Sequence, residues 1–338
     1  MEIPKRLNDI GALIDRAHES RKERPRGHLG CSGLGHDCER WIWLSFRWAV
    51  RKPFSGRILR LFRRGHLEEA QIIQDLKMIG IKIGGDQTRV DFGCHISGSV
   101  DGIIESGVPQ APNKQHVAEF KTHSKKSFDD LVKNGVEKSK PIHYAQMQLY
   151  MYGLDIDRAL YVAICKDDDT YYIERVKLDD KAAQKLLDKG KRLALEERLP
   201  PPISTDPSWY QCKFCDAHEF CHETKLTKEV NCRTCAHSTP KEDSTFYCER
   251  WRDTIPYKAQ VDGCPAHTLH PDLVPWDLVP DESEDFVAVY DVDGKRIKNG
   301  ENHFASSELI AGKELCADPM VQAIRDKFDG RITDGQKL

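Results

Sequence analysis

The chain has 338 residues, of which 39% are hydrophobic and 31% are charged, so it is long enough for one sizeable core and small appendages. Because it has no run of about 18 apolar residues and Met1–Arg6 lacks an apolar stretch, the sequence excludes a membrane-spanning helix and predicts no secretory signal. The net charge of −3 hides a division: residues 1–64 hold 15 Lys and Arg against 7 Asp and Glu, whereas residues 271–338 hold 8 against 15. A basic first part suits either a polyanionic partner or a dipolar surface with no partner.

The spacing of apolar residues predicts helices and strands that alternate along the first two thirds of the chain. Helices are expected over 7–20, 38–50, 55–78, 128–133, 142–154 and 179–197. Strands are expected over 81–83, 88–92, 95–105, 117–121, 159–165 and 170–176. Gly80 is expected to end the long third helix. The sequence therefore predicts one α/β domain with a mixed sheet over residues 1–225.

Three smaller regions are expected after this domain. Residues 226–270 are rich in cysteine and poor in periodic pattern. Residues 271–285 hold three prolines and six acidic residues, which is typical of a linker. Residues 286–338 predict a small C-terminal α+β subdomain, with a hairpin turning at Asp293-Gly294 and a helix over 319–328.

Two carboxylates and a lysine lie on neighbouring predicted strands. Asp101 ends one strand, and Glu119 and Lys121 lie on the next, where alternation puts both on one face and points Phe120 into the core. Carboxylates from neighbouring strands suit a hard divalent cation such as Mg²⁺ or Mn²⁺. A metal ion beside a lysine is what phosphodiester hydrolysis requires.

The next predicted helix carries a glutamine and a tyrosine four residues apart. Gln146 and Tyr150 share a helix face that suits a phosphate or an attacking water. Gln148 and Tyr152 repeat the spacing, so the register is open by two residues. Tyr144, two residues before Gln146, favours the first register.

The ordered set resembles the PD-(D/E)XK nuclease superfamily, in its RecB-like and lambda-exonuclease-like branch. Its members are Glu69 (in Gly65-His66-Leu67-Glu68-Glu69), Asp101, Glu119, Lys121, Gln146 and Tyr150. The resemblance covers roughly residues 30–225 and implies an αβββαβ core whose mixed central sheet is flanked by helices. Val100 stands where the name of the motif has proline. A charged strand with an ordinary salt bridge is the alternative, and the placement of every member on the required element argues against it.

The resemblance also implies roles. Asp101 and Glu119 would hold Mg²⁺ or Mn²⁺ together with the backbone carbonyl of Phe120, and Glu69 is a further candidate. Lys121 would help to activate water for in-line attack on a phosphate. Gln146 and Tyr150 would steady the substrate.

Seven of the 12 cysteines lie between residues 212 and 264. In a chain without a secretory signal, clustered cysteines usually bind metals. The first group is Cys212, Cys215 and Cys221. Cys38 is the preferred fourth ligand, and Cys31 is its competitor. The resemblance implies a [4Fe-4S] cluster that staples the ends of the nuclease domain, although thiolates also suit Zn²⁺.

The second group is Cys232, Cys235, Cys248 and Cys264. A C-x₂-C knuckle with two later cysteines is zinc-ribbon-like, and four ligands close a tetrahedral site, which favours structural Zn²⁺ over a redox role. His237 or His267 is an alternative to one of the cysteines. Since the region shows no core of its own, the metal is expected to supply its folding energy.

Basic segments surround the predicted centre. They are residues 21–28, the four arginines at 57, 60, 63 and 64, and the five lysines at 125, 126, 133, 138 and 140. Contact with DNA phosphates is the favoured interpretation, and a solvated face is the alternative. The tryptophans at 41, 43 and 48 are expected in the core and not as base-stacking platforms.

We therefore predict a metal-dependent DNA exonuclease. Resemblance to nucleases carried by bacteriophages implies recombination or replication-linked DNA processing in the cytoplasm of a bacterial host. DNA is the expected partner, with a single-strand annealing or single-strand-binding protein as a candidate second one. A structure- or sequence-specific endonuclease keeps the same fold and residues, and a non-catalytic DNA-binding scaffold is the alternative of another class. The H-x-E and P-C-x-x-C pair of zinc deaminases is absent.

Overall fold

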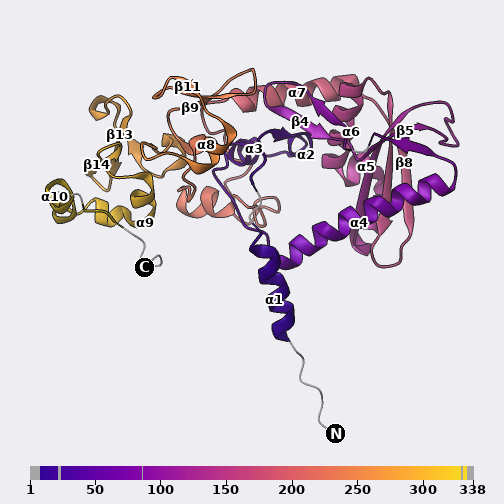
Figure 1. Ribbon diagram of the computed structural model, residues 1–338, viewed down its shortest axis with the longest axis horizontal. Helices are drawn as coiled ribbons and strands as arrows, with labels where there is room; N and C mark the ends of the chain where they lie inside the picture. Colours follow the sequence, from indigo (N-terminus) through magenta and orange to yellow (C-terminus); the bar gives the residue numbers. More distant parts are fainter. Residues whose placement is uncertain (1–7, 22–23, 86, 329, 333–338) are drawn as a thin grey trace, which may run out of the picture. The chain divides into compact units, whose positions relative to one another are not determined.

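The structure is a computed structural model that describes residues 8–21, 24–85, 87–328 and 330–332 (Figure 1). The chain forms two compact units, Met1–His36 with Lys52–Lys191, and Asp37–Arg51 with Arg192–Leu338. Each unit combines segments that are far apart in sequence. None of the helices among the described residues is long and apolar enough to cross a membrane.

The first unit contains a five-stranded sheet of order β2-β5-β6-β7-β8. Its strands are β2 (Lys82–Gly84), β5 (Gly102–Ser106), β6 (His116–His123), β7 (Arg158–Cys165) and β8 (Tyr171–Lys177). β6 and β7 are parallel, and the other neighbours are antiparallel. The sheet is therefore mixed, as the sequence predicts.

Helices cover both faces of this sheet. They are α4 (Gly56–Met78), α5 (Lys125–Ser139) and α6 (Pro141–Leu154), and α4 is the long helix in Figure 1. Gly190 of α7 (Asp180–Leu195) lies instead against Ile96 and Leu34. Ile72 and Leu76 of α4 pack with Phe120 of β6 in one buried cluster. His143 of α6 contacts Tyr161, which lies beside Glu119 in the parallel ladder and so on the opposite face from Phe120. The expected αβββαβ arrangement is confirmed.

A second, three-stranded sheet in this unit has the order β1-β4-β3. Its strands are β1 (Leu29–Gly30), β4 (Ile96–Ser99) and β3 (Arg89–Asp91), and the short helices nearby in sequence are α1 (Asn8–Glu19) and α2 (Cys31–Leu34). The single strand expected over 95–105 is wrong, because β4 and β5 belong to different sheets. The backbone N–H of Val100 still donates to the carbonyl of Thr88, and pairing with β6 begins at Gly102, so the chain passes from one sheet to the other around Asp101.

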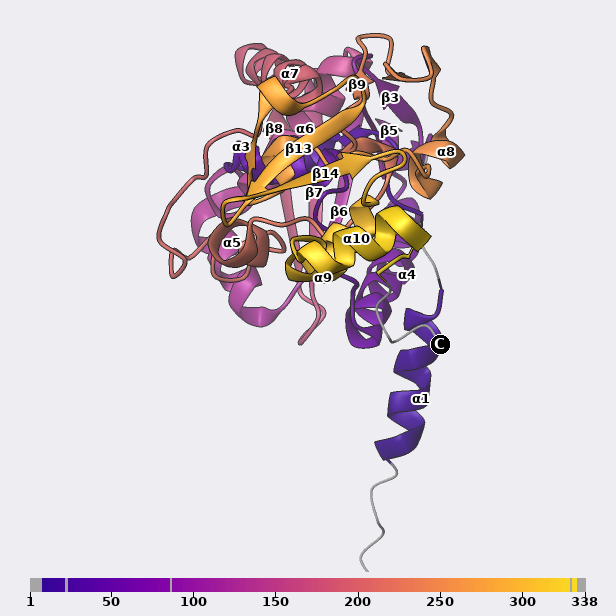
Figure 2. The same ribbon diagram turned by 90° about the vertical axis from the view of Figure 1, so that its left-hand side faces the viewer.

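The second unit is built around α3 (Glu39–Phe46) and the C-terminal half of the chain. Its other elements are β9 (Ser238–Pro240), β10 (Phe246–Cys248), β11 (Asp253–Thr254), α8 (Tyr257–Asp262), β12 (Asp277–Leu278), β13 (Val287–Val292), β14 (Lys295–Gly300), α9 (Ser306–Cys316) and α10 (Pro319–Phe328). Short turns of helix are η1 (Phe220–Thr224), η2 (Cys232–Thr234), η3 (Pro271–Leu273) and η4 (Pro280–Glu282). Figure 2 shows α9 and α10 beside the hairpin of β13 and β14, which confirms the hairpin and the last helix.

The cysteine knuckle contains a buried guanidinium. Arg233 is 1% exposed, and its guanidinium carbon lies 3.8 Å from the ring centroid of Trp48, 4.3 Å from Phe246 and 5.0 Å from Phe46. The guanidinium donates to the carbonyl of Phe46 and to Gln260, at 2.9 Å each. Two of these rings, Phe46 and Trp48, lie outside residues 226–270, so this segment packs around a desolvated cation together with residues at the end of α3. The aromatic partners at 46 and 48 come from near the start of the chain, which sequence spacing does not reveal.

The domain boundaries at 225, 270 and 285 stay a prediction. Within the segment expected as a linker, Leu273, Val274 and Trp276 are buried, and Trp276 packs with Tyr290 of β13. Of the tryptophans expected in the core, Trp43 and Trp48 are buried there.

Candidate active site

The connection between β4 and β5 places Asp101 beside β6. The backbone N–H of Phe120 donates to Oδ2 of Asp101 at 2.8 Å. β5 is antiparallel to β6, with Gly102 opposite Ala118, so Asp101 stands at the level of residues 119–121. The register of β5 on β6 and the hydrogen bond from Phe120 thus fix the position of the Asp101 carboxylate.

Lys121 joins the predicted metal ligands. Its ammonium forms an ion pair with Oε1 of Glu119, lies 3.6 Å from Oδ2 of Asp101 and donates to the carbonyl of Phe120 at 3.0 Å. Burial lowers the pKa of Lys121, but Glu119 and Asp101 outweigh it, so the net pKa is raised and the amine stays protonated. The three oxygen donors expected to bind a metal therefore surround an ammonium.

Glu119 is fully buried. Burial raises its pKa, and Lys121 partly offsets that effect. Among the described residues, neither carboxylate oxygen has a hydrogen-bond donor besides the Lys121 ammonium. Buried carboxylate oxygens without donors are what a cation satisfies, so in chemical type these residues fit Mg²⁺ or Mn²⁺.

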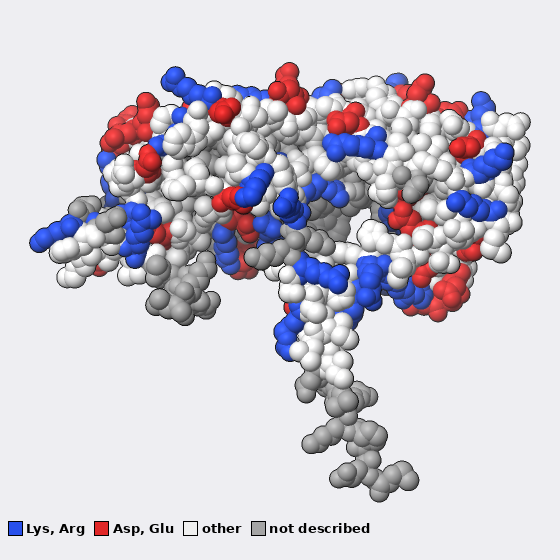
Figure 3. All heavy atoms as spheres, viewed as in Figure 1, with Lys and Arg blue, Asp and Glu red and all other residues white. Residues whose placement is uncertain are grey.

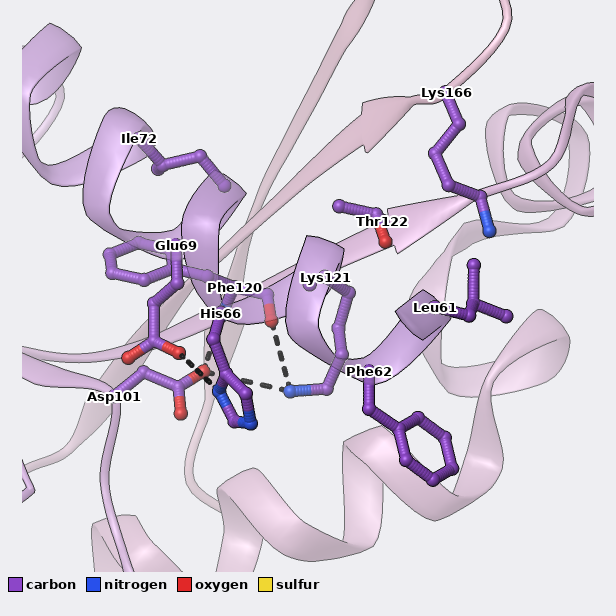
Figure 4. A pocket seen from close by; sticks show the side chains of 11 residues that line it. Leu61, Phe62, His66, Glu69, Ile72, Asp101, Phe120, Lys121, Thr122 and Lys166 are labelled. Carbon is purple, nitrogen blue, oxygen red and sulfur yellow. Dashed lines mark hydrogen bonds and ion pairs between the residues drawn. The ribbon is translucent and has the colours of Figure 1, made fainter. Parts of the chain in front are cut away.

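A cavity of about 390 Å³ opens over Lys121. It is lined by Leu61, Phe62, Gly65, His66, Glu69, Ile72, Asp101, Phe120, Lys121, Thr122 and Lys166. Glu69 and His66 project from α4 toward Asp101 and the end of Lys121 (Figure 4). Burial, and then the nearby charge of Asp101, raises the pKa of Glu69, while His66 lies 3.9 Å away and opposes the rise. A second carboxylate from a different element thus faces the cavity.

Gln146 and Tyr150 lie beneath this centre and do not line the cavity. Gln146 donates to the hydroxyl of Tyr150 at 3.3 Å. Burial raises the pKa of Tyr150, and the thiol of Cys31 and the carboxylate of Glu119 add to the rise. A Cβ on Gly98 of β4 would stand 2.6 Å from that hydroxyl, so glycine lets Tyr150 approach the strand.

The alternative register has other partners. Gln148 donates to the carbonyl of Lys177 and accepts from the N–H of Asp179, which ties α6 to the segment before α7. Tyr152 is half-exposed and donates to Gln184. Gln148 and Tyr152 therefore make structural contacts with the segment around α7, away from Lys121.

A buried hydrogen-bonded network that the sequence did not predict lies on the same face of the sheet. The hydroxyl of Tyr161 lies 2.9 Å from Nε2 of His123 and 2.9 Å from Nδ1 of His143. Burial lowers the pKa of His123 to about 4 and that of His143 to about 3, and nearby lysines, Lys121 among them, add to both. Both rings are therefore neutral at pH 7. The strand alternation that puts Glu119 and Lys121 on one face also puts His123 there, and this pattern could have identified His123 from the sequence.

The first group of cysteines gathers in the second unit. Burial, and then the Cys38 thiol, raises the pKa of Cys212. Burial also raises the pKa of Cys215 to about 11, with Cys221 and Cys38 adding to it. Cys31 lies in the first unit, where a Cβ on Gly98 would be 3.1 Å from its sulfur.

The four cysteines of the second group, Cys232, Cys235, Cys248 and Cys264, lie near one another. Burial raises the pKa of Cys232 to about 12, and Cys235, Cys264 and Cys248 all add to the rise. His267 is engaged elsewhere, with Nδ1 2.7 Å from the hydroxyl of Ser306 and Nε2 3.1 Å from the carbonyl of Asn231. Across the part of the chain that the structure describes, no group of three or more His, Cys, Asp or Glu side chains is positioned to hold a metal ion.

A family model described as the PD-(D/E)XK nuclease superfamily matches residues 6–222, which are 217 of the 338 residues. A search of curated proteins found no match.

Solved structures show weak overall similarity. SSO0001 is 16% identical, with a TM-score of 0.40, and the match covers 63% of this chain and 96% of that one. LHK-Exo, titled an alkaline exonuclease from Laribacter hongkongensis, is 17% identical, with a TM-score of 0.35 and coverage of 54% and 90%. Its complex with dAMP is 16% identical, with a TM-score of 0.34 and the same coverage.

The histidine network predicts a dependence of stability on pH. Because the folded-state pKa of His143 is about 3 against an ordinary 6.5, the unfolded chain takes up the proton first as the pH falls. The stability advantage of wild type over His143→Gln should therefore shrink between pH 6.5 and pH 4, by on the order of 2 kcal/mol. Urea unfolding at a series of pH values measures it.

Leu67→Ala is the matched control, because the Leu67 side chain is 62% exposed and carries no titratable group. Its difference from wild type should stay constant over the same pH range. An advantage over His143→Gln that does not change with pH would contradict the buried, neutral assignment of His143.

Proposed function

Since the chain belongs to the PD-(D/E)XK nuclease superfamily, we propose that it is a deoxyribonuclease that depends on Mg²⁺ or Mn²⁺. The observation that carries the proposal is the Lys121 ammonium, held among Asp101, Glu119 and the carbonyl of Phe120 at the wall of a cavity. A lysine paired with carboxylates at the wall of a cavity is a typical arrangement for handling a phosphodiester.

Each residue has a proposed task. Asp101, Glu119 and the Phe120 carbonyl would hold the metal, which supplies positive charge and lowers the pKa of a water. Lys121 donates hydrogen bonds and stabilises negative charge on the phosphate. Glu69 has a raised pKa, so its carboxylate is suited to take the proton of the attacking water. The water oxygen then bonds to phosphorus, and the bond from phosphorus to the leaving oxygen breaks.

Gln146 and Tyr150 are proposed as positioning residues. They lie behind Glu119 and outside the cavity lining, so they would orient the Glu119 carboxylate as a metal ligand. The residues that line the cavity would contact the substrate directly. Gly98 supports this arrangement, because any larger residue there meets the hydroxyl of Tyr150.

Exonuclease action on DNA is the preferred form of the proposal, and a role in phage recombination or replication-linked processing extends it. The exonuclease form rests on the resemblance of the Gln146 and Tyr150 motif to the lambda-exonuclease-like branch, and the phage role rests on the resemblance of the overall sequence to nucleases carried by bacteriophages. An endonuclease with the same residues is the second candidate. A single-strand annealing or single-strand-binding protein stays a candidate partner, and cytoplasmic location stays an expectation.

Digestion of end-labelled linear duplex, single-stranded and closed circular DNA, with Mg²⁺ or Mn²⁺, tests the proposal. Wild type should degrade linear DNA and leave circles intact. Glu119→Gln should lose at least about 100-fold in rate, because a neutral amide removes the charge that binds the metal. Glu105→Gln, an exposed carboxylate on the adjacent strand β5, is the control and should cut like wild type.

The other outcomes separate the candidates. Cutting of circles that Glu119→Gln abolishes would favour the endonuclease. Cutting that survives Glu119→Gln would contradict the assigned site. DNA binding without any cutting by a fully metal-loaded protein would favour the scaffold.

We also propose that Cys38, Cys212, Cys215 and Cys221 hold a [4Fe-4S] cluster, or Zn²⁺ in its place. Support comes from the proximity of Cys38 to Cys212 and Cys215 within the second unit. Structural Zn²⁺ is proposed for the second group, Cys232, Cys235, Cys248 and Cys264. The hydrogen bonds of His267 favour four cysteines over a mixed set there.

Iron and zinc analysis of anaerobically purified protein tests the first of these sites. Cys38→Ser should lose most of the iron and the visible absorbance of the cluster, because a three-thiolate site is incomplete. Cys31→Ser is the matched control and should keep both. The reverse pattern would move the fourth ligand to Cys31, and zinc without iron in wild type would identify the alternative metal.

A further inference from the structure

An aromatic pair lies at the rim of the active-site cavity. Phe62 of α4 lines the cavity and is 45% exposed. Phe54, 49% exposed, packs edge-on against it, with ring centroids 5.0 Å apart and an interplanar angle of 84°. Figure 4 shows Phe62 on the side of α4 that also carries His66, beside the end of Lys121. A ring supported at its edge keeps one face available to a ligand.

Basic side chains accompany the pair. Arg57, Arg63 and Arg64 are exposed on the same helix. Arg64 donates to the carbonyl of Lys166, a residue that lines the cavity on the strand side. Figure 3 shows Lys and Arg side chains gathered over the first half of α4. Cations around an aromatic surface suit an anionic chain that also has flat apolar groups, and they do not suit an apolar peptide or lipid tail.

We propose that Phe62, braced by Phe54, is a stacking site for an unpaired nucleobase of the strand whose phosphate enters the cavity. The inference rests on the proposed nuclease function and adds a specificity element to it. In a paired duplex both faces of a base are covered by its neighbours, so this subsite selects a single strand or a frayed end. Stacking needs only the π face of a base, so the subsite tolerates any sequence.

The placement on α4 links this subsite to the chemistry. Phe62 and His66 are four residues apart, and Glu69 follows three residues later, so all three share one helix face. A base held on Phe62 and a phosphate near Lys121 then belong to neighbouring parts of one strand. Trp43 and Trp48 are buried and offer no such surface, and the exposed Trp209 and Trp251 do not line the cavity.

Binding measured without divalent metal tests the inference separately from cutting. The probe is a short fluorescent single strand in chelator, in three forms: intact, with one 2-aminopurine, or with one abasic site moved along the strand. For wild type, 2-aminopurine should be quenched at one position, and an abasic site there should weaken binding by about 5- to 100-fold. Phe62→Ala should weaken binding of the intact strand by a similar factor and should become insensitive to the abasic site.

Matched variants complete the test. Leu67→Ala, on the same helix, removes a side chain that is 62% exposed and outside the cavity lining, and it should bind like wild type. Phe62→Trp should keep both the affinity and the quenching. Equal affinity of Phe62→Ala and Leu67→Ala, or an equal loss by Phe62→Ala on intact and abasic strands, would overturn the stacking site. Failure of wild type to bind any single strand would overturn it too, whether or not the protein cuts DNA.

Discussion

A buried carboxylate in the middle of a sheet needs a positive neighbour, and Lys121 supplies it to Glu119. Glu119 has no exposed surface, and an uncompensated charge there costs several kcal/mol. The lysine two residues along the same strand reaches Glu119, Asp101 and the Phe120 carbonyl at once. The arrangement places Asp101 at the level of β6, at the point where the chain passes from β4 to β5.

The two sides of this centre are specialised. Toward α4, Lys121, Asp101 and Glu69 line the cavity together with Phe62. Toward α6 the same strand face meets Tyr150 and the network of His123, Tyr161 and His143, which are largely buried. Positive charge from Lys121 and Lys140 adds to burial in keeping His143 neutral, so the network supplies hydrogen bonds without further charge. The side of the centre toward α6 is thus closed by buried, hydrogen-bonded side chains.

Much of the site was predictable, because its signals are local. Glu119 and Lys121 follow from strand alternation, and Glu69 follows from its place on an amphipathic helix. Asp101 was identified although its strand was drawn wrongly, since the break between β4 and β5 depends on burial of Val100 and on the hydrogen bond to Phe120. Local pattern does not carry that information.

Features that depend on long-range packing were not predictable. Arg233 reads as a surface cation in a cysteine knuckle, yet Phe46 and Trp48 bury it from nearly two hundred residues away. Phe62 was not singled out by the sequence, because its exposure at the cavity depends on which residues α4 covers. Such contacts join residues that are far apart along the chain, and a single sequence gives no direct sign of them.

We infer that the Lys121 ammonium occupies the place of a cation among the oxygens proposed to bind a metal. The most direct measurement is the dissociation constant for Mn²⁺ without DNA, for wild type, Lys121→Met and the double variant Lys121→Met with Glu119→Gln. The account predicts that Lys121→Met binds Mn²⁺ about tenfold or more tightly than wild type, because the ammonium no longer competes, and that the double variant loses the gain. Equal or weaker binding by a folded Lys121→Met, or undiminished binding by the double variant, would contradict it.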